Sequence, residues 1–134
     1  MTSSRLRIPR PIFDAMLAHA RAEHPNECCG FLAGANGEAT HRFPLINALA
    51  SAIAYEAEPR ELLAVHRAMR ELGVQEVAVY HSHPTSAPVP SASDLARNGY
   101  GATIPHVIIG PGGEVRAWWL DETDFEGAAW EVGD

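Results

Sequence analysis

The chain contains no lysine, so all ten of its Lys and Arg positions are arginine. These bases are outnumbered by 17 acidic residues, which gives a formal net charge of −7 with histidine neutral. A surface of this sign repels nucleic-acid phosphates unless a basic patch is set apart, and the sequence has no such patch. We therefore expect no nucleic-acid partner.

Cysteine is also scarce, since only Cys28 and Cys29 are present. Adjacent residues do not have the geometry that an ordinary structural disulfide requires, and reduced thiols suit the cytosol. No apolar run reaches the roughly 18 residues needed to cross a membrane, and residues 1–5 lack the apolar segment of a secretory signal. We expect a cytoplasmic protein that has no membrane partner.

Internal repeats, low-complexity segments and linkers are lacking as well. A chain of 134 residues has room for one domain, because domains usually take roughly 100 to 200 residues. Hydrophobic residues make up 46% of the chain, enough to form one core without disulfide support. We therefore expect residues 1–134 to form a single domain.

The hydrophobic pattern predicts helices that alternate with strands. Apolar residues recur at helical spacing over residues 12–20 and again over residues 62–72, where Gly73 ends the pattern. The predicted strands cover residues 28–34, 40–45, 77–83, 106–110 and 114–120, with a weaker one at 50–57. This order predicts an α/β domain with a mixed β-sheet flanked by helices. Six acids and no base lie in residues 121–134, where we expect a solvated acidic rim.

Two histidines stand two positions apart in the predicted strand at residues 77–83. Because side chains alternate between the faces of a strand, His81 and His83 project from one face about 6.6 Å apart, and both rings can turn onto one metal ion. Seven histidines in 134 residues give about 0.36 such pairs by chance, so two partly exposed histidines remain an alternative. Ser82 points to the opposite face, where we expect it to support the strand and not to act as a nucleophile.

Asp94 adds a carboxylate after the proline-rich loop that follows the histidines. Two histidines and one carboxylate leave the fourth tetrahedral position of a zinc ion open for water, as in catalytic sites. A helix cap is the alternative, because Ser91 and Asp94 have the spacing of a capping box. The full string, His-Ser-His-Pro followed by Ser-x-x-Asp, has a chance expectation of roughly 5 in 100,000. It is therefore far more specific than the histidine pair.

This string resembles the JAMM metallopeptidases, also called MPN domains with intact metal ligands. The segment Pro-Asn-Glu-Cys-Cys-Gly-Phe-Leu-Ala-Gly at residues 25–34 is similar to the part of that family that carries its catalytic glutamate. With the order of elements, the likeness covers nearly the whole chain. It implies the α/β fold that the JAMM/MPN family shares in outline with cytidine deaminases.

The resemblance also implies roles for individual residues. His81, His83 and Asp94 would bind Zn²⁺. Glu27 would be the general base, since a zinc-bound water needs a nearby carboxylate to take its proton and pass it to the leaving amine. Ser91 would help to hold the tetrahedral intermediate. By residue type alone, we would expect an acidic residue such as Glu27, which follows Pro-Asn, to lie exposed in a turn.

The activity implied by the resemblance is that of a zinc-dependent peptidase or isopeptidase. Because the chain has no room for the insertions of the eukaryotic deubiquitinating members, it is most similar to the compact bacterial subgroup that acts on ubiquitin-like sulfur-carrier proteins. We expect cleavage after the C-terminal Gly-Gly of such a carrier. The alternatives are a non-catalytic MPN-type interaction module and a zinc deaminase, whose His-x-Glu and Pro-Cys-x-x-Cys motifs the chain lacks.

Three further predictions concern residues outside the metal string. His66 lies on the apolar face of the second predicted helix, where we expect it to pack in the core. His106 enters a strand near the string and is a candidate to line the site. Cys28 and Cys29 are expected to be small buried thiols, because nothing in the sequence indicates a lowered pKa.

Overall fold

The computed structural model describes residues 5–99 and 101–134, and it contains one mixed sheet with the strand order β7-β6-β5-β4-β2-β3-β1-β8. The elements along the chain are β1 (Leu6–Pro9), α1 (Arg10–Glu23), β2 (Cys29–Ala35), β3 (Glu38–Leu45), α2 (Pro59–Leu72), β4 (Gln75–Ser82), α3 (Ala92–Ala96), β5 (His106–Ile109), β6 (Val115–Leu120), β7 (Phe125–Gly127) and β8 (Trp130–Gly133). Pairing is antiparallel except for β1 with β3, β1 with β8 and β4 with β5. The predicted α/β class, a mixed sheet flanked by helices, is confirmed.

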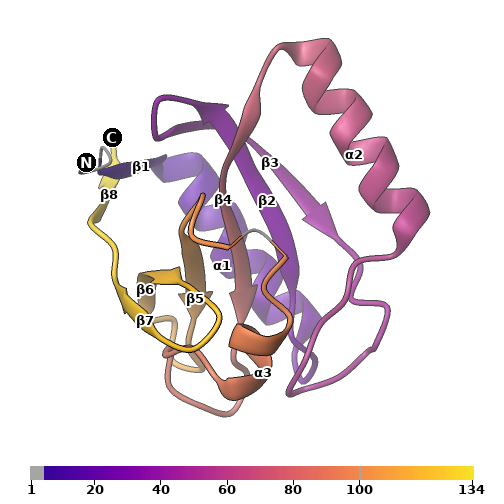
Figure 1. Cartoon of the computed structure of the whole chain (residues 1–134), viewed down its shortest axis with the longest axis vertical. Helices are drawn as coiled ribbons and strands as arrows, with labels where there is room; N and C mark the ends of the chain where they lie inside the picture. The colour runs from indigo at the N-terminus through magenta and orange to yellow at the C-terminus, as the bar shows by residue number, and fades with distance from the viewer. Residues whose placement is uncertain (1–4, 100) are drawn as a thin grey trace.

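Helices cover both faces of the central strands, so the molecule has three layers (Figure 1). On one face, α1 packs its apolar stripe against a core that includes Met16, Leu32 and Tyr80. On the other face, α2 packs against a core that includes Phe31 and Val79. Because side chains alternate along a strand, the adjacent residues Phe31 and Leu32 of β2 face opposite cores, and so do Val79 and Tyr80 of β4. No helix among the described residues is long and apolar enough to span a membrane.

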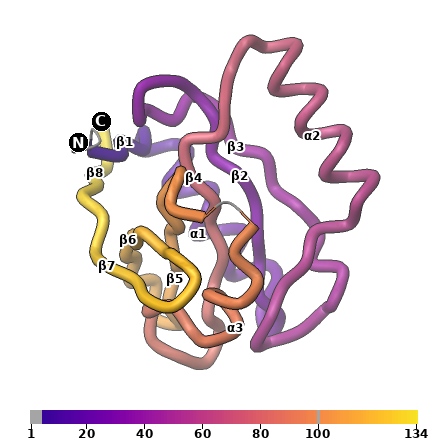
Figure 2. Tube along the Cα trace, in the orientation of Figure 1, coloured from indigo at the N-terminus to yellow at the C-terminus, as the bar shows by residue number. Residues whose placement is uncertain are grey.

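The edges of the sheet differ from the sequence-based prediction. The prediction of a strand at residues 50–57 is wrong. Within the described residues, this segment forms only one isolated bridge, in which Ala57 pairs with Asn47. The pattern also missed β1, β7 and β8, which are three or four residues long and too short to show a period. β1 and β8 pair in parallel and lie side by side (Figure 2). All six acids of residues 121–134 are exposed, as expected.

Tyr80 packs in the core between α1 and the central strands of the sheet. Its side chain is fully buried, and its ring lies against Gly30, its partner in the β2–β4 register. Its hydroxyl accepts a hydrogen bond from Arg42 Nη1 at 3.0 Å and lies 2.7 Å from Nδ1 of His19. The ring fits only because glycine has no Cβ, since a Cβ at Gly30 would lie 2.5 Å from Tyr80 Cε2.

We predict that Gly30→Ala destabilises the fold by about 1–3 kcal/mol, the usual cost of overpacking a well-filled core. The measurement is urea-induced unfolding. Gly127→Ala is the matched control, because Gly127 also lies in a strand but has no atom within 4 Å of the added Cβ position. Equal unfolding midpoints for the two variants would contradict the role of this contact.

Candidate metal centre

Two elements bring the predicted ligands together. His81 lies near the end of β4, and His83 follows directly after it, where its backbone N–H donates to the carbonyl of Ile109 at 2.8 Å. This bond continues the β4–β5 pairing by one residue and keeps both histidines on one face. Asp94 comes from α3, which packs back over the end of β4.

The three predicted ligands converge. Asp94 Oδ1 lies 3.3 Å from Nε2 of His81, and Oδ2 lies 3.0 Å from Nε2 of His83. One ligand atom from each residue lies within 4.8 Å of the other two, and all three side chains are buried. Two imidazole nitrogens and a carboxylate oxygen are donors that would suit zinc, and the group contains no fourth such residue among the described residues.

The surroundings orient both imidazole rings. Nδ1 of His83 lies 2.8 Å from the carbonyl oxygen of Ala87, so it carries the proton and donates there. This leaves Nε2 of His83 as the nitrogen that can bind a metal. The ring of Tyr55 stacks on His81 with centroids 4.8 Å apart.

Asp94 is also a capping residue. Its backbone N–H donates to Ser91 Oγ at 3.1 Å, and its Oδ2 accepts from the backbone N–H of Ser91 at 2.9 Å. The capping box that the sequence offers as an alternative is therefore present. It does not compete with ligation, because the same box fixes the carboxylate against the two histidines.

The electrostatics of the cluster favour a charged carboxylate. Burial raises the pKa of Asp94, but the close approach of His81 and the hydrogen bond from His83 outweigh this and hold the pKa below its usual range. Burial lowers the pKa of His83, but its bonds to Asp94 and to the Ala87 carbonyl outweigh burial and leave the pKa raised. The anionic oxygens are thus ready to bind a cation.

Glu27 lies beside this cluster and is not an exposed turn residue. It is 2% exposed, and its Oε1 has no hydrogen-bond partner among the described residues. Burial raises the pKa of Glu27 to about 8, with His83 opposing and Asp94 adding to the shift. A carboxyl group in this environment can exchange a proton near neutral pH.

The backbone around Glu27 is held by neighbouring segments. Its N–H donates to the carbonyl of Ser51 at 2.8 Å, and its carbonyl accepts from Asn47 Nδ2 at 3.1 Å. The next residue, Cys28, donates its N–H to Ser82 Oγ at 2.8 Å. Ser82 therefore supports the strand, as predicted.

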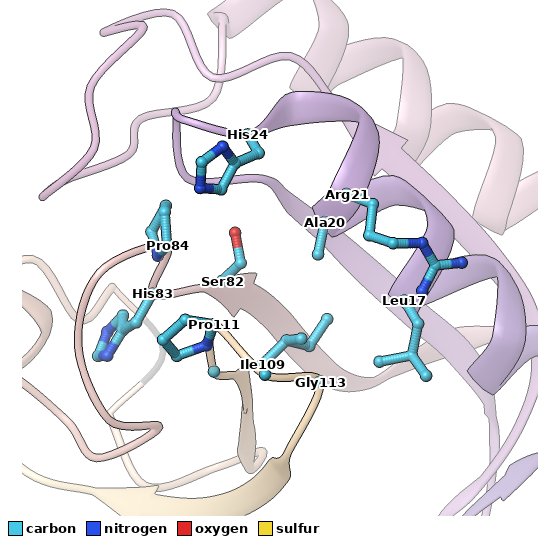
Figure 3. Close-up of a pocket in the computed structure, with 12 residues that line it drawn as sticks. Leu17, Ala20, Arg21, His24, Ser82, His83, Pro84, Ile109, Pro111 and Gly113 are labelled. Atoms are coloured by element: carbon cyan, nitrogen blue, oxygen red, sulfur yellow. The ribbon is translucent and has the colours of Figure 1, made fainter.

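Ser82 faces away from the metal cluster. Figure 3 shows its hydroxyl pointing into a cavity of about 420 Å³ between α1 and the ends of β4 and β5, while the ring of His83 turns away from that cavity. Cys28 and Cys29 are buried free thiols, as expected, and burial raises their pKa values to about 11 and 12. Neither is a ready nucleophile.

Sequence reasoning missed some residues of the site. Tyr55 belongs to the segment 50–57, where we expected a strand, and Asn47 lies just before that segment; no motif marks either residue. His66 packs on Phe31 of the core as predicted, but its side chain is only partly buried, and it pairs with Glu76 at 3.5 Å. His106 begins β5 and is buried, and the nearby charge of His81 adds to the burial that lowers the pKa of His106.

Curated relatives with similar sequences include two peptidases. A desampylase from Haloferax volcanii is 38% identical over 131 residues, which cover 91% of this chain and 94% of the relative. A CysO-cysteine peptidase from Mycobacterium tuberculosis is 39% identical over 92 residues, which cover 67% of this chain and 63% of the relative.

Solved structures share the fold. The solution structure of protein DSY2949 from Desulfitobacterium hafniense has a TM-score of 0.84 and 26% identity, with 96% of this chain and 93% of that chain covered. AF2198, a JAB1/MPN domain protein from Archaeoglobus fulgidus, has a TM-score of 0.63 and 20% identity, with 98% of this chain and 100% of that chain covered. The family model for prokaryotic homologues of the JAB domain matches residues 9–121. The chain therefore belongs to the prokaryotic homologues of the JAB domain, in agreement with its resemblance to the JAMM/MPN proteins.

Proposed function

We propose that this chain is a zinc-dependent peptidase that cleaves after the C-terminal Gly-Gly of a ubiquitin-like sulfur-carrier protein. The observation that carries the proposal is the buried carboxylate of Glu27 beside three convergent ligand groups. The relatives named as a desampylase and a CysO-cysteine peptidase support a peptidase acting on small protein modifiers. The two buried free thiols are consistent with a cytoplasmic location.

The residues fit the metal. Nε2 of His81 has no good hydrogen-bond partner although it is fully buried, and such a nitrogen is normally satisfied. His83 presents Nε2 because Nδ1 is engaged, and Asp94 supplies the anionic oxygen. When bound, zinc would supply a Lewis acid that makes a water molecule nucleophilic near neutral pH.

In the proposed mechanism, Glu27 takes the proton from the attacking water at its free Oε1. Because the carboxyl group is buried and its pKa is raised to about 8, it holds that proton and returns it to the leaving amine nitrogen. The Ser91 hydroxyl accepts from the backbone N–H of Asp94, so its own proton is free to donate to the developing oxyanion.

The two alternative functions, an interaction module and a zinc deaminase, assign different roles to the cluster of Glu27, His81, His83 and Asp94. A non-catalytic MPN-type module has no use for a buried, unpaired carboxylate beside a ligand set, and such a group costs stability. A zinc deaminase is disfavoured because its motifs are lacking. Hydrolysis therefore explains more of the site than either alternative.

We predict that His81→Ala, His83→Ala and Asp94→Ala each lose the metal, whereas Glu27→Gln keeps it and loses hydrolysis. The physical reason is that three side chains supply the ligand atoms, while Glu27 supplies only a proton acceptor. Metal content per chain and peptide cleavage are measured on the same preparations. If Glu27→Gln lost zinc as completely as His81→Ala, Glu27 would be a ligand and not the base.

We predict that Ser91→Ala lowers kcat by about 100-fold to 1,000-fold, the usual effect of removing an oxyanion donor. The variant also loses a helix cap, which costs about 0.5–2 kcal/mol of stability. Thermal unfolding and steady-state kinetics separate the two effects. Ser93→Ala in the same helix is the control and should change neither. A Ser91→Ala protein that melts earlier but turns over at the native rate would rule out the catalytic role.

We predict that the zinc-loaded protein trims a residue such as cysteine, or a short extension, placed after the diglycine of a ubiquitin-like sulfur carrier. The stiff, proline-rich loop at residues 84–90 borders the cluster and favours an extended peptide with small side chains. Mass spectrometry of the carrier detects the loss. Equal cleavage after bulky residues replace the diglycine, or cleavage of folded ubiquitin chains alone, would refute this specificity.

A further inference from the structure

His106 is a buried side chain whose polar atoms the mechanism above does not use. It is 3% exposed, and neither Nδ1 nor Nε2 has a hydrogen-bond partner among the described residues. Buried polar atoms are normally bonded, because leaving them unpaired costs free energy. A group that is unpaired in the protein alone therefore indicates a partner that arrives from outside.

The strand register places His106 on the same face as the metal cluster. His106 begins β5 and pairs with Val79 of β4, two residues before His81. Because side chains alternate, the His106 ring lies on the same face of the sheet as Val79 and His81. His106 is nevertheless not one of the three convergent ligands.

A cavity of about 370 Å³ opens over His106. Its walls are formed by Cys29, Phe31, Val79 and Leu62, and its rim carries the ion pair between Arg97 and Glu56 at 3.3 Å. The rim charges are paired, and among the described residues that line the cavity His106 is the one whose buried polar atoms lack a partner. A cavity of this size, with few polar groups, is typical of a ligand site.

The cavity adjoins the metal cluster through two shared residues. Tyr55 lines the cavity and also stacks on the ring of His81. Cys29 lines it too, and it is the direct partner of His81 in the β2–β4 register. A chain bound at the cluster can therefore continue into the cavity.

The chemistry of His106 selects the kind of group that it binds. The ring of His106 is buried with both nitrogens unpaired among the described residues, and none of the salt bridges among those residues includes it. A neutral imidazole has one N–H donor and one nitrogen acceptor. This matches the carbonyl and N–H groups of a peptide main chain and offers no positive charge to a carboxylate.

We infer that His106 is a substrate-binding residue, which hydrogen-bonds the main chain of the peptide tail lodged in the cavity beside the metal cluster. The inference rests on the proposed function for the identity of that tail as an extended segment ending in diglycine. Small residues suit the cavity, because they let the main chain approach the buried ring of His106. His106 thus contributes to the preference for glycine.

The test compares two replacements of His106 in the zinc-loaded protein. His106→Phe keeps an aromatic ring but removes both nitrogens, whereas His106→Gln keeps one donor and one acceptor. We expect His106→Phe to retain the metal, to melt no earlier than the native protein, and to raise KM for the carrier about tenfold with kcat changed much less. We expect His106→Gln to recover most of that loss. His41→Phe, a change on β3 outside the cavity, is the control.

Two outcomes would overturn the inference: an unchanged KM in His106→Phe, or a KM for His106→Gln as high as for His106→Phe. A native protein that cleaves no carrier would refute the proposed function instead. In that case, NMR of the imidazole nitrogens in zinc-loaded Glu27→Gln still tests whether His106 contacts a peptide. The probe is a peptide ending in Gly-Gly. A shift of the His106 nitrogens supports the contact, and no shift at high peptide concentration overturns it.

Discussion

The site depends on the register between β2 and β4. Cys29 pairs directly with His81, and the bonds between Cys28 and Ser82 fix the strands at the end where Glu27 precedes β2. A slip of one residue would turn every side chain of β4 to the other face. The two histidines would then point toward α1, and Tyr80 would lose its place over Gly30.

Burial governs the chemistry of this region. Among the described residues, the buried side-chain polar atoms without a partner all belong to Glu27, His81 and His106. They lie around one cluster instead of being scattered through the core, which is where functional sites depart from the rule that buried polar groups are paired. The fold elsewhere supplies the stability that this cluster costs.

Asp94 shows how one residue serves stability and chemistry together. The capping box that begins α3 holds its carboxylate with the backbone N–H of Ser91, and the same Oδ2 faces His83. A cap and a ligand are therefore compatible readings of the Ser-x-x-Asp pattern. The capping hydrogen bonds of the short helix hold the carboxylate against the two histidines.

The sequence by itself determined the long elements, the α/β class and the set of residues that converge as a ligand group, because helical and strand periods and the metal string are local patterns. It did not reveal β1, β7 and β8, which are too short to show a period and depend on pairing at the sheet edges. Only the tertiary structure decided that Glu27 is buried beside His83, that Tyr55 stacks on His81, and that His106 lies unpaired in a cavity. These contacts join segments that are distant along the chain, so strand register and packing set them, and no local pattern encodes them.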